Sequence, residues 1–470
     1  MALGQSGSAH RRRGMHEHPA VLSARGSGVV MIKESTRRQL TMKLTIFAAG
    51  SRGDMQPCIA LGSGLQQAGY RVCLAAPEDF AGLIQQHEVG VYPLRGDVQQ
   101  RMASDTGRKL MERGGANPIT AIRAMRTLIG PVVKTMAEDA YSACRQADAL
   151  ICLGVFSPFG HAIAEALRIP MLTIEPTPLL PTRAFPAPSW PIQRDLGGLH
   201  NYLSGLAMLQ AIWLWYRPFV HAFRKRLGLP RSNATACYRA LRAAPMLSAY
   251  SPSIIPHPAD WPASVHITGY LFLDQRADWQ PSSELSAFLE AGAPPVVIGF
   301  GSMAGRNPEQ LARLAIEALA RSGQRGLLLT GWGGLRTASV PENVFVLDSA
   351  PHSWLFPRMA AVVHHGGAGT TAEGVRAGVP SVIVPFAFDQ AFWGARIHAL
   401  GVGPEPIPKK HLTAERLAAA ISMAITDSDM KQRATACGVA IRAEHGLSNA
   451  LNFVTSSLGT PGAAKGKQNP

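Results

Sequence analysis

The sequence predicts an α/β protein built from two doubly wound domains, and three observations support this prediction. Short apolar runs suited to buried strands alternate with helical patterns, and at this spacing the alternation indicates a parallel sheet. The alternation occurs twice, before and after an irregular section between residues 176 and 295. The chain of 470 residues has the length of two domains of ordinary size.

The first half holds four apolar runs that are predicted to be strands. Helical patterns follow them, as at Ile119–Arg145 and His161–Leu167, and another helix runs through Leu65. The turn after the first strand contains only two glycines, so it is a weak match to a dinucleotide-binding turn. The predicted strands are Leu44–Ala49, Arg71–Ala76, Ala149–Gly154 and Met171–Glu175.

Residues 176–262 break this rhythm. The stretch 176–191 is dense in proline, and Leu203–Val220 is apolar and aromatic, with basic residues just after it. Its uninterrupted apolar part is shorter than the about 20 residues that span a bilayer. Two interpretations stay open: a buried helix beside an acceptor cleft, or a flap over 203–226 that contacts a membrane or a lipophilic acceptor with its basic residues at the headgroups.

The polar, proline-bearing stretch Gly269–Pro295 is predicted to connect the domains. We expect a first domain over 42–275, a linker over 276–295, a second domain over 296–440 and a last helix over 441–458 that crosses back to the first domain. The linker contains a short helical pattern at Ser283–Ala291. In the second domain the predicted strands are Val296–Phe300, Gly326–Thr330, Asn343–Leu347, Ala361–His364 and Ser381–Val384, and the predicted helices are Pro308–Arg321, Thr370–Ala377, Gln390–Ala399 and Thr413–Thr426.

One turn of the second domain suits an anion. Four small residues, 366–369, follow the strand that ends at His364-His365, and a helical pattern then opens with Thr370 and Thr371. Backbone N–H groups at a helix start lack partners and carry the positive end of the helix dipole. An ordinary tight turn is the alternative. The paired histidines and threonines, with Asp389-Gln390 after the next strand, favour a phosphate-and-sugar site.

The stretch HHGGAGTTAEGVRAGVPSVIVPFAFDQAFWGARIHALGVGPEP resembles the nucleotide-sugar motif of family 1 glycosyltransferases, the UDP-glycosyltransferase superfamily. In particular it is similar to the bacterial and fungal sterol 3-beta-glucosyltransferase branch. The resemblance covers most of residues 42–455 and implies the GT-B fold, in which two Rossmann-like domains face each other across a cleft. It implies a hexosyltransferase that uses a UDP-sugar as co-substrate, with no cofactor and no metal.

The resemblance also implies which residues bind the donor. Glu373 matches the carboxylate that the family uses on the ribose. Asp389 and Gln390 match the pair that holds sugar hydroxyls; a helix N-terminus capped by Asp389 is the structural interpretation, and the two roles are compatible. The residues implied at the diphosphate are Ser302, His365, Gly367, Gly369, Thr370 and Thr371.

The uracil side departs from the plant members of the family. Those members have a stacking Trp near position 349 and an Asn where Trp393 stands, whereas this chain has Ser349-Ala350-Pro351-His352. Stacking on the base must therefore come from elsewhere. The candidates on the uracil side are Trp332, Ala350 and His352.

Asp54 is the candidate catalytic base. It follows the first strand in the string Gly53-Asp54-Met55-Gln56-Pro57, at the position where plant members carry a histidine and where bacterial relatives carry an aspartate. A carboxylate there would accept the proton of the acceptor hydroxyl late in a single displacement that inverts the anomeric carbon. A helix N-cap is the alternative role.

Two features bear on metals and redox state. The string Asp427-Ser428-Asp429 matches the D-x-D of metal-dependent glycosyltransferases of another fold, but it lies on a polar turn between two helical patterns. We interpret it as a helix cap. The six cysteines are scattered with no C-x-x-C pair, which favours a reducing cytosol.

The net charge of +15 suits anionic partners such as a UDP-sugar or anionic lipid. Nucleic acid is disfavoured because no basic–aromatic motif repeats. Residues 1–41, rich in Arg, Ser and Gly, are expected to form a disordered basic tail, with a membrane-tethering arm as the alternative; 459–470 are expected to form a second disordered tail. We expect a cytoplasmic protein with peripheral contact at the inner face of the membrane.

Together these features predict an inverting glycosyltransferase that moves a hexose, with glucose as the expected sugar, from a UDP-sugar to a lipophilic alcohol such as a sterol or triterpenoid. The alternative acceptors are a polyketide, carotenoid, flavonoid or other secondary metabolite. Two hypotheses from other classes are a UDP-sugar epimerase of the same fold and a catalytically silent binding protein. Transfer would show itself by UDP release that depends on an added alcohol.

Overall fold

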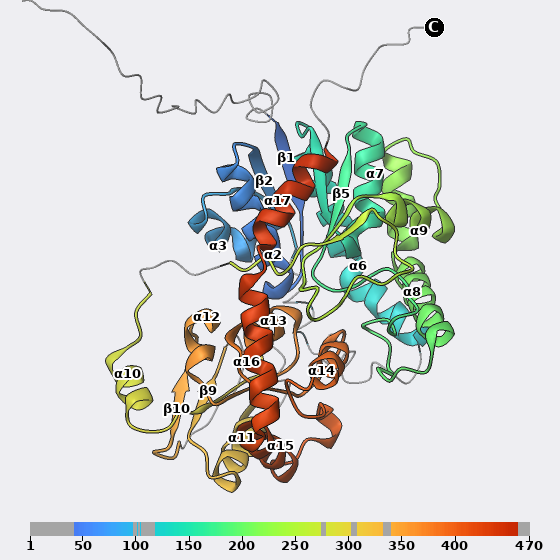
Figure 1. Ribbon diagram of the computed structural model, residues 1–470. Coiled ribbons are helices and arrows are strands. Elements are labelled where there is room, and N and C mark those ends of the chain that lie inside the picture. Colours follow the sequence, from blue (N-terminus) through green and yellow to red (C-terminus); the bar gives the residue numbers. More distant parts are fainter. Residues whose placement is uncertain are drawn as a thin grey trace, which may run out of the picture.

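The computed structural model describes residues 42–96, 101, 104, 118–273, 279–301, 308–331 and 340–458, with the side chains of 118–125 left aside. Within this part the chain forms two parallel sheets, each covered by helices (Figure 1). The predicted two-domain α/β class is therefore confirmed. Ser302 and Trp332 lie outside the described residues, as do the two terminal tails.

The first sheet has seven strands in the order β3-β2-β1-β4-β5-β6-β7, all paired in parallel. Helices α2 (Arg52–Gln67), α3 (Ala81–Gln86), α6 (Pro118–Cys144), α7 (Ser157–Leu167), α8 (Gly198–Arg226) and α9 (Ala234–Ala243) connect the strands or flank them. The strands are β1 (Lys43–Phe47), β2 (Arg71–Pro77), β3 (Gly90–Leu94), β4 (Ala149–Leu153), β5 (Met171–Glu175), β6 (Met246–Ser248) and β7 (Val265–Ile267).

Three strands of this sheet escaped prediction. β3 lies at the edge of the sheet, contains Pro93 and is only partly buried, as expected for an edge strand that tolerates proline. β6 and β7 are three residues long, too short to show a period in the sequence. Their strand character comes from pairing with β5 and with each other.

The second sheet has five parallel strands in the order β10-β9-β8-β11-β12. Its strands are β8 (Val296–Gly299), β9 (Gly326–Leu329), β10 (Val344–Leu347), β11 (Ala361–His364) and β12 (Ser381–Ile383). The helices of this half are α10 (Ser283–Glu290), α11 (Pro308–Arg321), α12 (His352–Leu355), α13 (Ala368–Ala377), α14 (Gln390–Ala399), α15 (Ala414–Thr426), α16 (Ser428–Ala443) and α17 (Gly446–Ser457).

The last two helices extend along both halves of the molecule (Figure 1). α16 packs on α13 in the second half, and α17 packs on α2 in the first. Ala450 and Val454 of α17 are buried in the core of the first sheet, and the rings of Phe453 and His266 stack with centroids 5.0 Å apart. Asp427 caps α16 by accepting a hydrogen bond from Met430 N at 2.9 Å, so the helix-cap interpretation of 427–429 is confirmed.

Helix α8 contains the apolar stretch that left two interpretations open. In its C-terminal half Trp213, Tyr216, Val220 and Phe223 are buried in the core of the first sheet. Arg224 is also buried and forms an ion pair with a glutamate on α7. One face of this half is therefore buried in the core, while Arg217 and Lys225 are exposed on it. No helix in the described ranges combines the length and the apolar character that crossing a membrane requires.

Candidate functional site

Two helix N-termini meet where the halves of the chain face each other. α2 begins after β1, and α13 begins after β11, so both start at the carboxyl edges of their sheets, where open α/β folds bind ligands. A Cβ added to Gly53 would lie 3.4 Å from Gly369 N, and a Cβ added to Gly369 would lie 3.2 Å from Gly53 Cα. Glycine at both positions lets the two helix ends come this close.

Asp54 lies in the first turn of α2. Its Oδ2 accepts hydrogen bonds from Ser51 N at 2.7 Å and from Ser51 Oγ at 2.8 Å. Ser51 is the N-cap residue and Asp54 is its capping-box partner, so the alternative role of Asp54 as the N-cap residue itself is wrong. Gly50, at φ 148°, leaves room for the carboxyl, because a Cβ there would lie 2.5 Å from Asp54 Oδ2.

The electrostatic state of Asp54 suits a base. Burial raises the pKa of Asp54 to about 6, the two hydrogen bonds from Ser51 oppose this shift, and the negative charge of Asp389 adds to it. Asp389 belongs to the second half of the chain, so this charge acts on Asp54 from across the junction. At neutral pH Asp54 remains mostly ionised and has a pKa close to the working pH, which suits proton transfer.

Asp389 is bound from both halves. Its Oδ2 accepts a hydrogen bond from Thr177 Oγ1 at 2.9 Å and another from Trp393 Nε1 at 2.9 Å, and burial raises its pKa. Asp389 precedes α14, but its side chain makes no capping bond to the helix. Asp389 is therefore the N-cap residue of α14 by position, but its carboxyl does not cap the helix. The neighbouring Gln390 is buried, and its Oε1 accepts hydrogen bonds from two backbone N–H groups of the preceding loop, at 386 and 387.

The predicted diphosphate residues gather at the start of α13. Gly367 is the N-cap residue of that helix, and Gly369 and Thr370 lie partly exposed in its first turn. Thr371 is fully buried, and its Oγ1 has no hydrogen-bond partner among the described residues. The threonine hydroxyl on the accessible side of this turn is therefore that of Thr370.

His365 follows β11 and is neutral at physiological pH. Burial lowers its pKa to about 4, and its Nδ1 has no hydrogen-bond partner among the described residues. A neutral imidazole can still donate one N–H to an anion. The preceding His364 is buried, and its Nδ1 accepts from Gly366 N at 3.1 Å, so it helps to shape the turn.

The ribose and uracil candidates flank the same helix. Glu373 lies 3.7 Å from Arg376 in an ion pair within α13. His352 begins α12, which packs on α13, and its ring stacks on Phe356 with centroids 4.4 Å apart. Burial lowers the pKa of His352 to about 4, helped by the positive charge of Arg52 and by His365. The partly buried Ala350 precedes α12.

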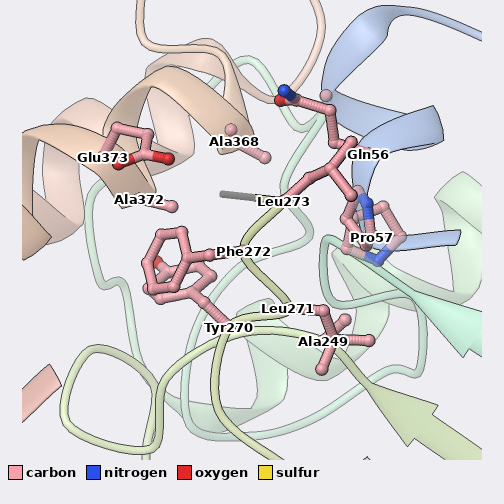
Figure 2. Close-up of a pocket in the computed structure, with 13 residues that line it drawn as sticks. Gln56, Pro57, Ala249, Tyr270, Leu271, Phe272, Leu273, Ala368, Ala372 and Glu373 are labelled. Atoms are coloured by element: carbon pink, nitrogen blue, oxygen red, sulfur yellow. The ribbon is translucent and has the colours of Figure 1, made fainter. Parts of the chain in front are cut away.

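A small pocket opens between the two halves, and its lining includes Gly53, Gly369 and Glu373. Figure 2 shows Ala368, Ala372 and Glu373 on the α13 side and Gln56 and Pro57 on the α2 side. The aromatic rings of Tyr270 and Phe272, from the segment after β7, close it from below in this view. The remaining lining residues are Pro176, Ala249, Leu271 and Leu273.

Sequence reasoning missed several members of this site. Thr177, which contacts Asp389, lies in the proline-dense stretch, where no motif marks it. Ser51 has no distinctive signal in the sequence, because the capping pair that it forms with Asp54 is a local pattern that many helices share. Among the described residues no group of three or more His, Cys, Asp or Glu side chains could hold a metal ion.

Comparison with known proteins agrees with this geometry. Residues 44–186 match the family model "Glycosyltransferase family 28 N-terminal domain", and residues 332–445 match "Erythromycin biosynthesis protein CIII-like, C-terminal domain". A solved structure, the glycotransferase of kitacinnamycin, covers 89% of this chain and 99% of its own with a TM-score of 0.66 at 19% identity. That likeness confirms the GT-B fold.

Two curated relatives are similar along most of the chain. A sterol 3-beta-glucosyltransferase from Arabidopsis thaliana is 35% identical over 90% of this chain and 69% of its own length. The O-mycaminosyltylonolide 6-deoxyallosyltransferase from Streptomyces fradiae is 36% identical over 88% of this chain and 97% of its own length. The chain spans 64% of a second sterol 3-beta-glucosyltransferase from Arabidopsis thaliana. With these matches on both halves, the chain belongs to the GT-B glycosyltransferases of the UDP-glycosyltransferase superfamily, alongside the sterol 3-beta-glucosyltransferases.

Proposed function

We propose that this glycosyltransferase moves glucose from UDP-glucose to the hydroxyl of a lipophilic alcohol of the sterol or triterpenoid class, with inversion at the anomeric carbon. The observation that carries the proposal is the close approach of Gly53 and Gly369, which brings the start of α2, where Asp54 lies, against the start of α13 in the other half of the chain. Asp54 is available as a base and Asp389 as a sugar ligand. The likeness to sterol 3-beta-glucosyltransferases supports the acceptor class.

The chemistry divides between the two halves. The acceptor oxygen attacks the anomeric carbon while the bond from that carbon to the diphosphate oxygen breaks, and Asp54 takes the hydroxyl proton. The released UDP keeps the electron pair. Its charge is met by the N-terminal N–H groups of α13, by Thr370 and by one N–H of the neutral His365. Asp389 holds sugar hydroxyls, and Glu373 holds the ribose. No step uses a metal or cofactor.

A second candidate acceptor is a polyketide or another secondary metabolite. The relative from Streptomyces fradiae favours it, because the match covers 97% of that enzyme at 36% identity. Both candidates share the donor side and the base, and they differ only in the acceptor that the first half binds. A rigid sterol exposes one hydroxyl at the end of a long apolar body, whereas a macrolide exposes many polar groups.

An acceptor screen tests the proposal. The full chain is incubated with UDP-glucose and a panel of sterols, hopanoid-type triterpenoids, macrolides and flavonoids, with UDP release and product mass as readouts. We expect UDP release that requires an added alcohol and a product heavier by one hexose for sterols or triterpenoids. Product with macrolides or flavonoids alone would favour the second candidate. Sugar isomerisation with no acceptor would point to an epimerase and contradict transfer.

We further propose that the protein meets its acceptor in the cytoplasm at a membrane surface. Alcohols of this class partition into bilayers because nearly all of their surface is apolar. The basic net charge of +15 supports contact with an anionic inner leaflet.

A further inference from the structure

Exposed aliphatic side chains gather in one short segment before and at the start of α8. Of the ten large hydrophobic side chains exposed in the described part of the chain, four lie within residues 192–203. Single exposed aliphatics are ordinary, but a local group of them marks an interaction surface. We call this group the 192–203 patch. Its members and their exposures are Ile192 48%, Leu196 54%, Leu199 69% and Leu203 51%.

The charge along α8 and the segment before it is mostly positive. The 29 residues of α8 include no Asp or Glu, while Arg217 and Lys225 are exposed toward its C-terminal end. Within the patch segment Arg194 is exposed, and the acidic Asp195 accepts hydrogen bonds from Gly197 N and Asn201 Nδ2. Exposed leucines at the start of α8 are therefore followed, further along the same helix, by exposed basic side chains.

The patch is tied to the loop that borders the catalytic junction. Asn201 Nδ2 donates to Arg183 O at 3.0 Å, and Ser204 Oγ accepts from Ala187 N at 2.8 Å. The same loop begins with Thr177, which contacts Asp389. Figure 1 shows α8 at the outer edge of the first half of the chain, on the side away from α17. A surface bound at the 192–203 patch would therefore lie next to the first half of the chain, which is proposed to bind the acceptor.

We propose that the 192–203 patch, with the basic end of α8, docks this enzyme on an anionic lipid bilayer. The proposal rests on the proposed function, because a lipophilic alcohol is drawn from such a bilayer. Leucines enter the region between headgroups and chains, while Arg217 and Lys225 attract the anionic headgroups. A second copy of the chain fits this surface less well, because it would bring the same basic charges against it.

This proposal places the membrane contact earlier in the chain than the sequence suggested. The sequence suggested a flap over 203–226, but the aromatic part of that stretch is buried in the core, and Arg224 and Arg226 form ion pairs with Glu165 and Glu138. The exposed apolar surface lies earlier, in 192–203. Leu203 and the exposed cations Arg217 and Lys225 belong both to the predicted flap and to the proposed docking surface.

Vesicle flotation tests the docking surface. The full chain is mixed with vesicles of phosphatidylcholine alone or of phosphatidylcholine with about a third of phosphatidylglycerol, an anionic lipid. We expect binding to the anionic vesicles that weakens with salt. The double variant Leu199→Ser/Leu203→Ser should bind them at least about tenfold less tightly, because two buried aliphatic contacts are lost. The variant Arg217→Gln/Lys225→Gln should keep weak binding and lose its salt dependence.

The matched control is Met423→Ser/Val439→Ser, which alters equally exposed aliphatics on α15 and α16, at 50% and 57% exposure. It should bind vesicles like the unmodified chain. Equal binding of both double variants, or no binding by the unmodified chain, would overturn the proposal. Size-exclusion chromatography adds a further outcome: an unmodified dimer that the leucine variant converts to a monomer would assign the patch to a second copy instead.

Failure of docking and failure of the proposed function give different results. Transfer to an acceptor dissolved in detergent does not need the bilayer, so the leucine variant should keep the kcat of the unmodified chain in that assay. Transfer to the same acceptor embedded in anionic vesicles should fall with the loss of binding. If no acceptor is glucosylated in detergent while vesicle binding persists, the acceptor class is wrong and the docking surface stands.

Discussion

Thr177 Oγ1 donates a 2.9 Å hydrogen bond to Asp389 Oδ2, and this bond joins the two halves of the chain at the carboxylate proposed to hold the donor sugar. Trp393 Nε1 donates to the same oxygen from within the second half. The orientation of Asp389 therefore depends on side chains from both halves of the chain.

The first prediction concerns this bond. Thr177→Val keeps the side-chain volume and removes the hydroxyl, so Asp389 loses one of the two donors that fix it. Hydrogen bonds to a charged group contribute more than neutral ones, and we expect the KM for UDP-glucose to rise about tenfold. Steady-state kinetics with varied UDP-glucose measures this change.

The same loop offers a control for Thr177→Val. Thr182 Oγ1 donates to Asp260 Oδ1 at 2.7 Å within the first half, so Thr182→Val removes a similar bond that does not reach the donor. It should lower the melting temperature without raising the donor KM. If both variants raise the donor KM equally, the contact between Thr177 and Asp389 has no special role.

The second prediction separates the base from the donor site. Asp54→Asn keeps an acceptor atom for Ser51 and so preserves the start of α2, but it cannot take a proton. We expect kcat to fall about a thousandfold, within the range for loss of a general base, while the UDP affinity stays nearly unchanged. Calorimetry with UDP supplies the second measurement. Equal losses in kcat and in UDP affinity would show that Asp54 supports donor binding rather than proton transfer.

The third prediction is the pH profile. Burial and the charge of Asp389 raise the pKa of Asp54 to about 6, and only the ionised form accepts a proton. The value of kcat/KM should therefore rise about tenfold per pH unit up to about 6 and level off above it. The acidic limb should be missing from Asp54→Asn. A limb centred near the ordinary aspartate pKa would mean that Asp54 is exposed to water during catalysis.

The fourth prediction concerns the phosphate side. Removing the one N–H that the neutral His365 can donate should weaken UDP binding about tenfold in His365→Ala, as measured by calorimetry. The matched control is His398→Ala, because His398 is exposed on α14 in the same half of the chain. It should bind UDP like the unmodified chain. Unchanged UDP affinity in His365→Ala would remove this residue from the phosphate site.

Local runs of apolar residues in the sequence predicted most strands of the two sheets. The bounds of β5 and β11 agree with prediction to the residue, and the other predicted strands differ by one or two residues. These strands are continuous apolar runs because both faces of a parallel sheet are covered. β6 and β7 carry no such signal, since they are short and their pairing is decided by residues far away in sequence.

The site was predictable only where its chemistry lies in a contiguous motif. Asp389 and His365 belong to one contiguous stretch of the sequence, so the resemblance to the nucleotide-sugar motif identified both of them. Thr177 is 212 residues away from Asp389 in the sequence, and no local sequence pattern indicates that their side chains are in contact. The close approach of Gly53 and Gly369 is likewise a property of the folded pair of domains.

The last prediction concerns a buried acid that the proposed chemistry does not use. Glu175 ends β5 and is 3% exposed, and its Oε1 makes no hydrogen bond to a described residue. It faces Gly154 at the end of β4, where a Cβ would overlap Oε1. Burial raises the pKa of Glu175 well above its ordinary value, so the folded protein binds this proton more tightly than the unfolded chain does.

The pKa of Glu175 is higher in the folded protein than in the unfolded chain, and this determines how the free energy of unfolding changes with pH. The stability that Glu175 contributes is complete below the unfolded glutamate pKa of about 4.3 and declines as pH rises toward the folded value, because the unfolded chain then binds fewer protons. Glu175→Gln has nearly the same shape and no proton to lose. Chemical denaturation between pH 5 and pH 8 should show a flatter decline in the free energy of unfolding for this variant than for the unmodified chain. Parallel declines would mean that Glu175 is ionised in the folded protein, with a cation or solvent beside it.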